Sequence, residues 1–263
     1  MRAMIFAAGL GTRLKPITDT TPKALVPVCS QPLLKHLIDK LKAAGYTSVV
    51  INVHHFADKI REYVAANNNF GIEVLFSDET DLLRETGGGI RHAAPLLDKG
   101  EPFLVHNVDI LSNLDLEDFY DSHMAESISI DTPLATLLVS RRETARYFLF
   151  DKGNNLVGWM NKLSGEVKSP YAELRRDPSQ GFDWEKFLNE NSLRNYAFAG
   201  THIISPEVFR IMEKWPERFP IVDFYLQMAD KYIIKGYVKD DLKMVDVGKL
   251  DSLNEAEEFL LCK

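Results

Sequence analysis

The feature that most constrains the fold of this chain is the alternation, in its first half, of short apolar runs with stretches of helical periodicity. The apolar runs predict strands over residues 1–7, 48–53, 72–77 and 103–109. Apolar residues at helical spacing predict helices over residues 31–44, 57–66, 89–97 and 115–126. Strands separated by helices predict a parallel sheet with right-handed crossovers, and near-continuous apolar strands predict that both of its faces are buried.

The second half of the chain is richer in predicted strands. Residues 135–140, 147–151 and 156–160 are expected to form a meander, with a turn at residues 151–155. Further strands are expected at 196–204, 234–238 and 243–247, and helices at 205–215, 221–231 and 250–261. Residues 163–195 are polar and irregular, which is typical of an insertion, with one short helix at 183–189. We expect a single α/β domain over 1–263, with halves at 1–125 and 126–263.

Composition excludes several functional classes. The chain has 263 residues and a net charge of −7, so a surface for nucleic acid is not its main feature. Its two cysteines, Cys29 and Cys262, form no metal-binding pattern and fit a reduced, cytoplasmic setting. No apolar segment approaches the roughly 20 residues that cross a bilayer. We therefore expect no nucleic-acid partner and no membrane span.

A long irregular segment follows the first strand. It contains GLGTR at residues 9–13, and glycines there allow the backbone to approach an anion closely. A P-loop is excluded because no Gly-Lys-Ser/Thr opens into a helix, and a dinucleotide fingerprint is excluded by Leu14 and Pro16. The remaining interpretation is a phosphate-binding loop that supplies its own cations, Arg13 and Lys23.

Residues 7–28, AAGLGTRLKPITDTTPKALVPV, resemble the signature of the sugar-1-phosphate nucleotidyltransferases. The resemblance implies a Rossmann-like, mixed but mostly parallel sheet flanked by helices, with a smaller β-rich lobe for the sugar. It implies that residues 1–125 bind the nucleotide and residues 126–263 the sugar. By resemblance, the nucleotide and its phosphates would be held by Ala8, Gly9, Gly11, Thr12, Arg13 and Lys23.

Two further motifs extend the resemblance on the nucleotide side. ETGGGI, residues 85–90, is similar to the segment that lines the nucleobase in members acting on N-acetylmuramic acid 1-phosphate with UTP and in some mannose-1-phosphate guanylyltransferases. Glu85, Gly87 and Gly88 would line the base there, with glycines leaving a bare backbone edge on which the base can lie. Asn107 would contact the nucleotide at the end of the fourth predicted strand.

Acidic residues at two strand ends are the expected metal ligands. Asp109 ends the fourth predicted strand in NVD, and Asp246 lies in KMVDVGK, which resembles a late motif of the family. The resemblance implies that both bind Mg²⁺ and that Arg13, Lys23 and Asp109 are catalytic. Val108, Met244 and Lys249 depart from the usual family residues, and their effect on activity stays open.

Sugar-side residues are expected at three places. GWMNK, residues 158–162, corresponds to a family segment in which Asn161 and Lys162 would bind the sugar and its phosphate. Gly200, in FAGTHIIS, would let the sugar pack on the backbone, and Asn52 is expected to reach the substrate.

The reaction implied by the resemblance joins a nucleoside triphosphate, UTP or GTP, to a sugar 1-phosphate and releases pyrophosphate. The alternative is an inactive nucleotide-sugar sensor or partner subunit, and a nicotinamide-dependent dehydrogenase is excluded by Leu14 and Pro16. The sequence leaves open the base, the sugar, the role of residues 163–195 and whether the protein is a monomer or a small homo-oligomer.

Overall fold

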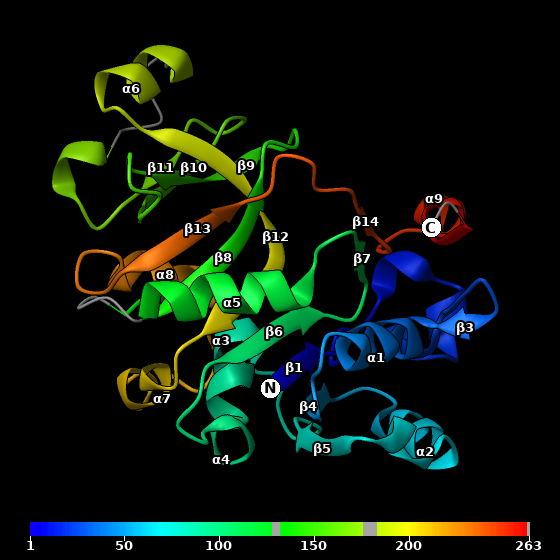
Figure 1. Cartoon of the computed structure of the whole chain (residues 1–263). Helices are drawn as coiled ribbons and strands as arrows, with labels where there is room; N and C mark the ends of the chain where they lie inside the picture. Colours follow the sequence, from blue (N-terminus) through cyan, green and yellow to red (C-terminus); the bar gives the residue numbers. More distant parts are fainter. Residues whose placement is uncertain (128–131, 176–182, 262–263) are drawn as a thin grey trace.

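The computed structural model describes residues 1–127, 132–175 and 183–261. Its first half is built on four parallel strands: β1 (Arg2–Phe6), β4 (Ser48–Val53), β5 (Glu73–Asp78) and β6 (Phe103–Asn107). β1 lies between β4 and β6, and the main sheet runs β11-β10-β9-β12-β6-β1-β4-β5. The predicted α/β fold with a mixed, mostly parallel sheet is confirmed, and Figure 1 shows helices on both sides of it.

The sheet continues into the second half through the long strand β12 (Arg194–Ile204), which runs antiparallel to β6. β12 also pairs with β8 (Ala135–Ser140) and with β9 (Arg146–Phe150). The expected meander is therefore wrong at its first step, because β8 and β9 each pair with β12. The β9–β10 hairpin is confirmed, since Asp151 Oδ1 accepts hydrogen bonds from the backbone N–H groups of Gly153 and Asn155 in its turn.

The remaining strands complete the β-rich lobe. β13 (Ile234–Val238) lies parallel to β8, and β10 (Leu156–Asn161) carries the two-residue strand β11 (Val167–Lys168) at the sheet edge. Within the polar 163–195 segment, helix α6 (Trp184–Glu190) begins where predicted, with the Asp183 side chain as its N-cap. Residues 176–182 of that segment lie outside the described part of the chain. Figure 1 places α6 and β9–β11 together at the end of the molecule away from α2.

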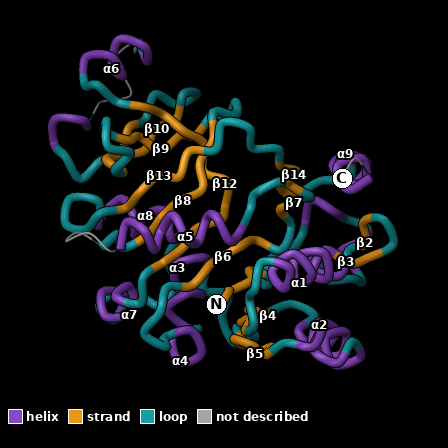
Figure 2. Tube along the Cα trace, in the orientation of Figure 1, coloured by secondary structure: helices purple, strands orange, loops and turns teal. Residues whose placement is uncertain are grey.

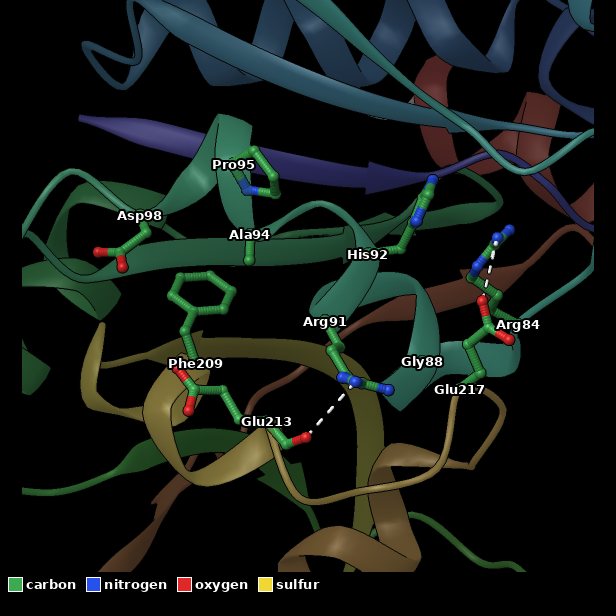
Figure 3. A pocket seen from close by; sticks show the side chains of 10 residues that line it. All are labelled: Arg84, Gly88, Arg91, His92, Ala94, Pro95, Asp98, Phe209, Glu213 and Glu217. Carbon is green, nitrogen blue, oxygen red and sulfur yellow. Dashed lines mark hydrogen bonds and ion pairs between the residues drawn. The ribbon is translucent and has the colours of Figure 1, made fainter.

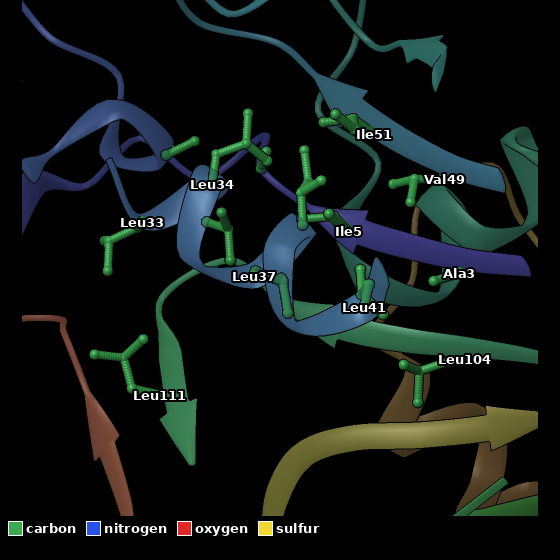
Figure 4. Close-up of a cluster of buried hydrophobic side chains, with 14 of the residues drawn as sticks. Ala3, Ile5, Leu33, Leu34, Leu37, Leu41, Val49, Ile51, Leu104 and Leu111 are labelled. Carbon is green, nitrogen blue, oxygen red and sulfur yellow. The ribbon is translucent and has the colours of Figure 1, made fainter. Parts of the chain in front are cut away.

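One hydrophobic cluster fills the space between the sheet and the helices α1 (Leu33–Ala43), α2 (Ala57–Ala66), α5 (Leu116–Ser127) and α9 (Asp251–Leu261). Leu33, Leu34, Leu37, Ile38 and Leu41 recur at helical spacing on α1 and are buried. In Figure 4 Leu34 and Leu41 of α1 lie on the side of Ile5 of β1 and of Val49 and Ile51 of β4, whereas Leu33 lies toward Leu111. Alternate strand residues share this face because successive side chains of a strand point to opposite sides.

The second cluster packs on the opposite face of the sheet. It joins Met4 of β1 and Val50 of β4 to α3 (Glu85–His92), α4 (Ala94–Leu97), α7 (Glu207–Met212) and α8 (Ile221–Met228). The predicted helix at 89–97 is therefore two helices, and the first begins four residues earlier than expected. α7 and α8 each end three residues before the predicted limit. None of the described helices is long and apolar enough to cross a membrane.

Two small ladders lie beside the main sheet. β2 (Pro27–Val28) and β3 (Gln31–Pro32) form a hairpin with Ser30 in its turn at φ of 63°, so α1 begins at Leu33, two residues later than predicted. β14 (Met244–Asp246) pairs antiparallel with β7 (Ile110–Ser112). Figure 2 shows β14 and β7 side by side near α9, so the end of the chain returns to the carboxyl end of β6.

Candidate active site

A cavity of about 480 Å³ lies at the carboxyl ends of β1, β4 and β6. Ligands of parallel α/β sheets bind at this edge. The residues that line the cavity are Phe6, Ala7, Ala8, Gly9, Leu10, Gly11, Thr12, Arg13, Lys23, Asn52, Glu79, Leu83, Glu85, Thr86, Asn107, Val108, Asp109 and Gly248. The structure thus brings together most of the nucleotide-side residues predicted from the sequence, from loops that are distant along the chain.

The glycine loop is folded into three short 3₁₀ turns, Thr12–Leu14, Ile17–Asp19 and Lys23–Leu25. Gly11 has φ of 64°, and a Cβ there would lie 2.9 Å from Thr18 Cγ2, while the Thr18 hydroxyl donates to the Gly11 carbonyl at 2.8 Å. Gly9 differs, since no heavy atom lies within 4 Å of its would-be Cβ. Leu14, Ala24 and Val26 anchor the loop in the core, and the backbone around Gly9 faces the cavity, where its N–H groups can bind an anion.

Lys23 and Asp109 meet at the wall of the cavity. Lys23 Nζ donates to Asp109 Oδ2 in an ion pair whose side chains are 11% and 18% exposed. The Asp109 carbonyl accepts a hydrogen bond from the backbone N–H of Val247 at 2.9 Å. This bond extends the β7–β14 ladder, in which Asp246 pairs with Ile110. The two acids that lie 137 positions apart in sequence are therefore neighbours in space.

Arg13 reaches the same place from the glycine loop. A Cβ on Gly248 would lie 2.9 Å from Arg13 Nη2 and 2.8 Å from Asp246 Oδ1. The guanidinium and the carboxylate thus both border Gly248, and a larger residue there would displace the end of one of these side chains. Arg13, Lys23 and Asp109 therefore line one end of the cavity, and Asp246 lies just outside the lining, beside Gly248. Two cations and a nearby pair of carboxylates are suited to phosphate groups and a divalent cation.

A buried polar network supports the base of the glycine loop. Asn52 Oδ1 accepts hydrogen bonds from the backbone N–H groups of Ala7 and Ala8, at 2.7 and 3.3 Å, and Asn52 Nδ2 donates to Glu79 Oε1 at 2.8 Å. Glu79 is fully buried, and its other carboxyl oxygen accepts from the backbone N–H of Arg84 at 3.0 Å. Asn52 thus supports the loop and also lines the cavity, and its expected contact with the substrate stays a prediction.

Sequence reasoning missed Glu79, Leu83 and Thr86 among the residues that line the cavity. A signal for Glu79 was present, since it directly follows β5 and so lies at the same sheet edge as Asp109. The predicted strand ended at residue 77, which left Glu79 two positions into a loop.

The glycine cluster of α3 is positioned differently from the expectation. Glu85 and Thr86 line the cavity, whereas Gly87 and Gly88 face the loop between α7 and α8. A Cβ on Gly87 would lie 2.2 Å from the Phe219 ring, and one on Gly88 would lie 2.3 Å from the Glu217 carbonyl oxygen. Glycine is therefore required here for packing between two segments of the protein, which differs from the bare edge expected for a base.

The expected sugar-side residues lie on the β-rich lobe. Asn161 Oδ1 accepts from the backbone N–H groups of Leu163 and Ser164, at 3.0 and 3.4 Å, so its carbonyl oxygen is used in a local turn. Lys162 Nζ lies 4.7 Å from the centre of the Tyr147 ring. Gly200 has φ of 74°, and its would-be Cβ lies 2.7 Å from Asn107 Nδ2. Of these three positions, Gly200 is the one in contact with a residue that lines the cavity.

Part of this chain is similar in sequence to two bacterial enzymes of the same name. The chain is 46% identical over 109 residues to N-acetylmuramate alpha-1-phosphate uridylyltransferase of Caulobacter vibrioides, a match covering 41% of this chain and 45% of the relative. It is 44% identical over 115 residues to the enzyme of the same name from Neisseria meningitidis, covering 44% of this chain and 49% of that one. The match thus spans about half the length of each relative.

Among solved structures, a putative glucose-1-phosphate thymidylyltransferase from Bacillus anthracis, in complex with a sucrose, has the same fold. Its TM-score is 0.74 at 17% identity, and the match covers 98% of this chain and 95% of that one. The sequence model of the nucleotidyl transferase family matches residues 2–263. The chain therefore belongs to the nucleotidyl transferase family.

Proposed function

We propose that this protein transfers a nucleotidyl group from a nucleoside triphosphate to a sugar 1-phosphate, forming a nucleoside diphosphate sugar and pyrophosphate. The observation that carries the proposal is the meeting of Arg13, Lys23 and Asp109 at one cavity beside the glycine loop, with Asp246 next to the lining residue Gly248. The family and the names of the relatives support the same reaction class.

The chemistry requires little beyond positioning and charge neutralisation. An oxygen of the sugar phosphate, already ionised, forms a bond to the α-phosphorus while the bond to the bridging oxygen breaks and pyrophosphate leaves with the electron pair. The backbone N–H groups of the glycine loop would hold phosphate oxygens. Arg13 and Lys23 would stabilise the charge that develops on the leaving pyrophosphate.

The acid pair fits a magnesium ion. In the described ranges 1–127, 132–175 and 183–261, no group of three or more His, Cys, Asp and Glu side chains could hold a metal. Mg²⁺ in nucleotide enzymes is held by one or two carboxylates, with substrate phosphates and water completing its shell. Asp109 and Asp246 match that donor set, and the ion would neutralise phosphate charge. Lys23 would release Asp109 when the ion and the phosphates arrive.

UTP or GTP is the proposed donor, and N-acetylmuramic acid 1-phosphate is the first acceptor to test, because both relatives above are named for it. Pyrophosphate release should be measured for five nucleoside triphosphates against the 1-phosphates of N-acetylmuramic acid, mannose and glucose, with Mg²⁺ and with excess EDTA. Turnover with at least one pair, abolished by EDTA, is expected.

The matched variants are Asp246→Asn at the site and Asp39→Asn on α1, where Asp39 forms an exposed ion pair with Lys35. Asp246→Asn should lose at least about two orders of magnitude in turnover, as expected for removal of one essential electrostatic contact. Asp39→Asn should keep wild-type turnover. Full activity of Asp246→Asn, or no pyrophosphate from any substrate pair, would refute the proposal.

A further inference from the structure

The loop between α7 and α8, residues 213–220, is bound tightly to the first turns of α3. The Phe219 carbonyl oxygen accepts hydrogen bonds from the backbone N–H groups of Gly87 and Gly88, at 2.9 and 3.1 Å. In return, the Phe219 N–H donates to the Arg84 carbonyl at 3.4 Å. The backbone of this loop therefore satisfies the Gly87 N–H, which lies in the first turn of α3 and has no partner within the helix.

Side chains strengthen the same contact. Arg218 Nε pairs with Glu85 Oε1 at 3.0 Å, and Arg84 Nη2 pairs with Glu217 Oε1 at 3.6 Å. Figure 3 shows Arg84 and Glu217 joined in this way beside Gly88, at a cavity of about 650 Å³ between α3 and the α7–α8 loop. The Thr86 hydroxyl oxygen accepts from the backbone N–H of Ile221 at 2.9 Å, which ties α3 to the first residue of α8.

The loop is itself anchored by aromatic packing. The Phe219 side chain belongs to a residue only 4% exposed, and its ring centre lies 4.8 Å from that of Trp215 and 6.2 Å from that of Phe224. Its edge covers Gly87 so closely that a Cβ there would lie 2.2 Å from Phe219 Cε2. The ring thus fills the space that a side chain on α3 would otherwise take.

We infer that Phe219 is a positioning residue that fixes the first turn of α3, and through it the cavity-facing residues Glu85 and Thr86. Gly87 and Gly88 are glycines because the α7–α8 loop lies against them. The effect on substrate rests on the proposed function, in which this cavity holds the nucleotide. The hydrogen bond between Thr86 and Ile221 extends the contact to α8. The first and second halves of the chain therefore contact each other between α3 and the α7–α8 loop.

A steric complementation experiment tests the inference. Gly87→Ala forces a methyl group into the Phe219 ring, and Phe219→Val removes all three ring atoms nearest to it, Cε2, Cδ2 and Cζ. In Gly87→Ala, the KM for the nucleotide that supports wild-type turnover should rise at least tenfold and the Tm should fall. In the double variant, KM should return to within threefold of Phe219→Val alone, and the Tm should exceed that of Gly87→Ala.

Gly88→Ala is the matched control. Its methyl group would meet the Glu217 backbone carbonyl oxygen at 2.3 Å, which no change at position 219 removes. Phe219→Val should therefore leave the Gly88→Ala defect in KM and Tm unchanged. Equal rescue of both glycine variants would mean a general loosening of the loop and would overturn the inference. The inference would also be overturned if the Tm of Gly87→Ala/Phe219→Val recovered while its KM stayed at least tenfold above that of Phe219→Val alone. That result would show that Gly87 serves the ligand directly.

The outcome is separable from the proposed function. If the wild-type chain turns over no substrate pair, the proposed function fails, but the positioning of α3 is still measured by hydrogen exchange of residues 84–90. Exchange there should be at least tenfold faster in Gly87→Ala than in the wild type and should slow again in the double variant. Unchanged exchange in Gly87→Ala would refute the positioning role.

Discussion

The polar network beneath the glycine loop has a fixed hydrogen-bonding direction, and this gives a sharp prediction for Glu79→Gln. The Asn52–Glu79 pair accepts hydrogen bonds from the backbone at both ends. The N–H groups of Ala7 and Ala8 donate to Asn52, and the N–H of Arg84 donates to Glu79. Two amide side chains that hydrogen-bond to each other leave one NH₂ donor and one carbonyl acceptor for their outer neighbours, so such a pair cannot accept at both ends. One of the two side chains, Asn52 or Glu79, must be a carboxylate.

Glu79→Gln therefore leaves two donors facing each other in whichever way the two amides are turned. One buried donor without a partner costs ~1–3 kcal/mol of unfolding free energy. With an unfolding entropy of about 2.1 cal/mol/K per residue, 1 kcal/mol corresponds to about 2 °C for a chain of 263 residues, so the Tm should fall by about 2–6 °C. Because the network holds Ala7 and Ala8, the KM for the nucleotide should rise as well.

The reciprocal exchange supplies the control. Asn52→Asp alone places two carboxylates in contact inside the protein and should also lower the Tm. The double variant Asn52→Asp/Glu79→Gln restores one carboxylate and one amide, with acceptors at both ends, and should recover most of the stability lost in either single variant. Thermal unfolding of the four proteins at pH 7.5 measures this. A wild-type Tm for Glu79→Gln, or a double variant that shows the sum of the two single losses, would refute the reasoning.

Three further predictions concern the site, the core and pH. Asp109→Asn should keep the fold by circular dichroism but lower turnover at least about 100-fold, since it removes a carboxylate at the reacting phosphates; near-normal turnover at saturating Mg²⁺ would contradict the assignment. Leu34→Ala, at a fully buried position, should lower the urea unfolding free energy by ~2–5 kcal/mol, whereas Leu163→Ala, at a position 86% exposed, should change it by less than about 0.5 kcal/mol. Burial lowers the pKa of His202 to about 3 and that of His123 to about 4, from an ordinary value of 6.5. The unfolded chain then binds more protons below pH 6.5, so stability should be greatest above that pH and should fall by ~1.4 kcal/mol per pH unit for each histidine as the pH drops toward 4; equal urea midpoints at pH 7 and pH 5 would contradict this.

Local patterns were sufficient for the elements whose neighbours are close in sequence. The α2 and β4 boundaries follow from apolar periodicity, and the glycine loop was recognisable because its glycines, prolines, Arg13 and Lys23 all lie within 20 residues of one another. The resemblance to a late family motif identified Asp246, and the strand-end rule identified Asp109. The same rule applied to β5 would have included Glu79, had the strand not been ended at residue 77.

Long-range contacts account for what the sequence did not show. Three glycines in a row are poor helix formers, so the start of α3 was predicted at residue 89, but the Phe219 carbonyl oxygen accepts hydrogen bonds from Gly87 and Gly88 and stabilises the earlier turn. The pairing of β8 and β9 with β12, rather than with each other, depends on a strand about 45 to 70 residues away. A local pattern contains no information about a partner at that distance.

Strand β12 has a consequence for how this protein can be divided. It pairs with β6 of the first half over Thr201–Ile204 and with β9 of the lobe over Arg194–Tyr196, and its pairing with β8 is interrupted between Phe198 and His202, around Gly200. The two halves therefore share β12, which is an interior strand of one continuous sheet. Expression of residues 1–125 alone would leave β6 with an open, apolar edge that invites aggregation, so the chain is expected to tolerate a nick in its surface loops far better than truncation between its halves.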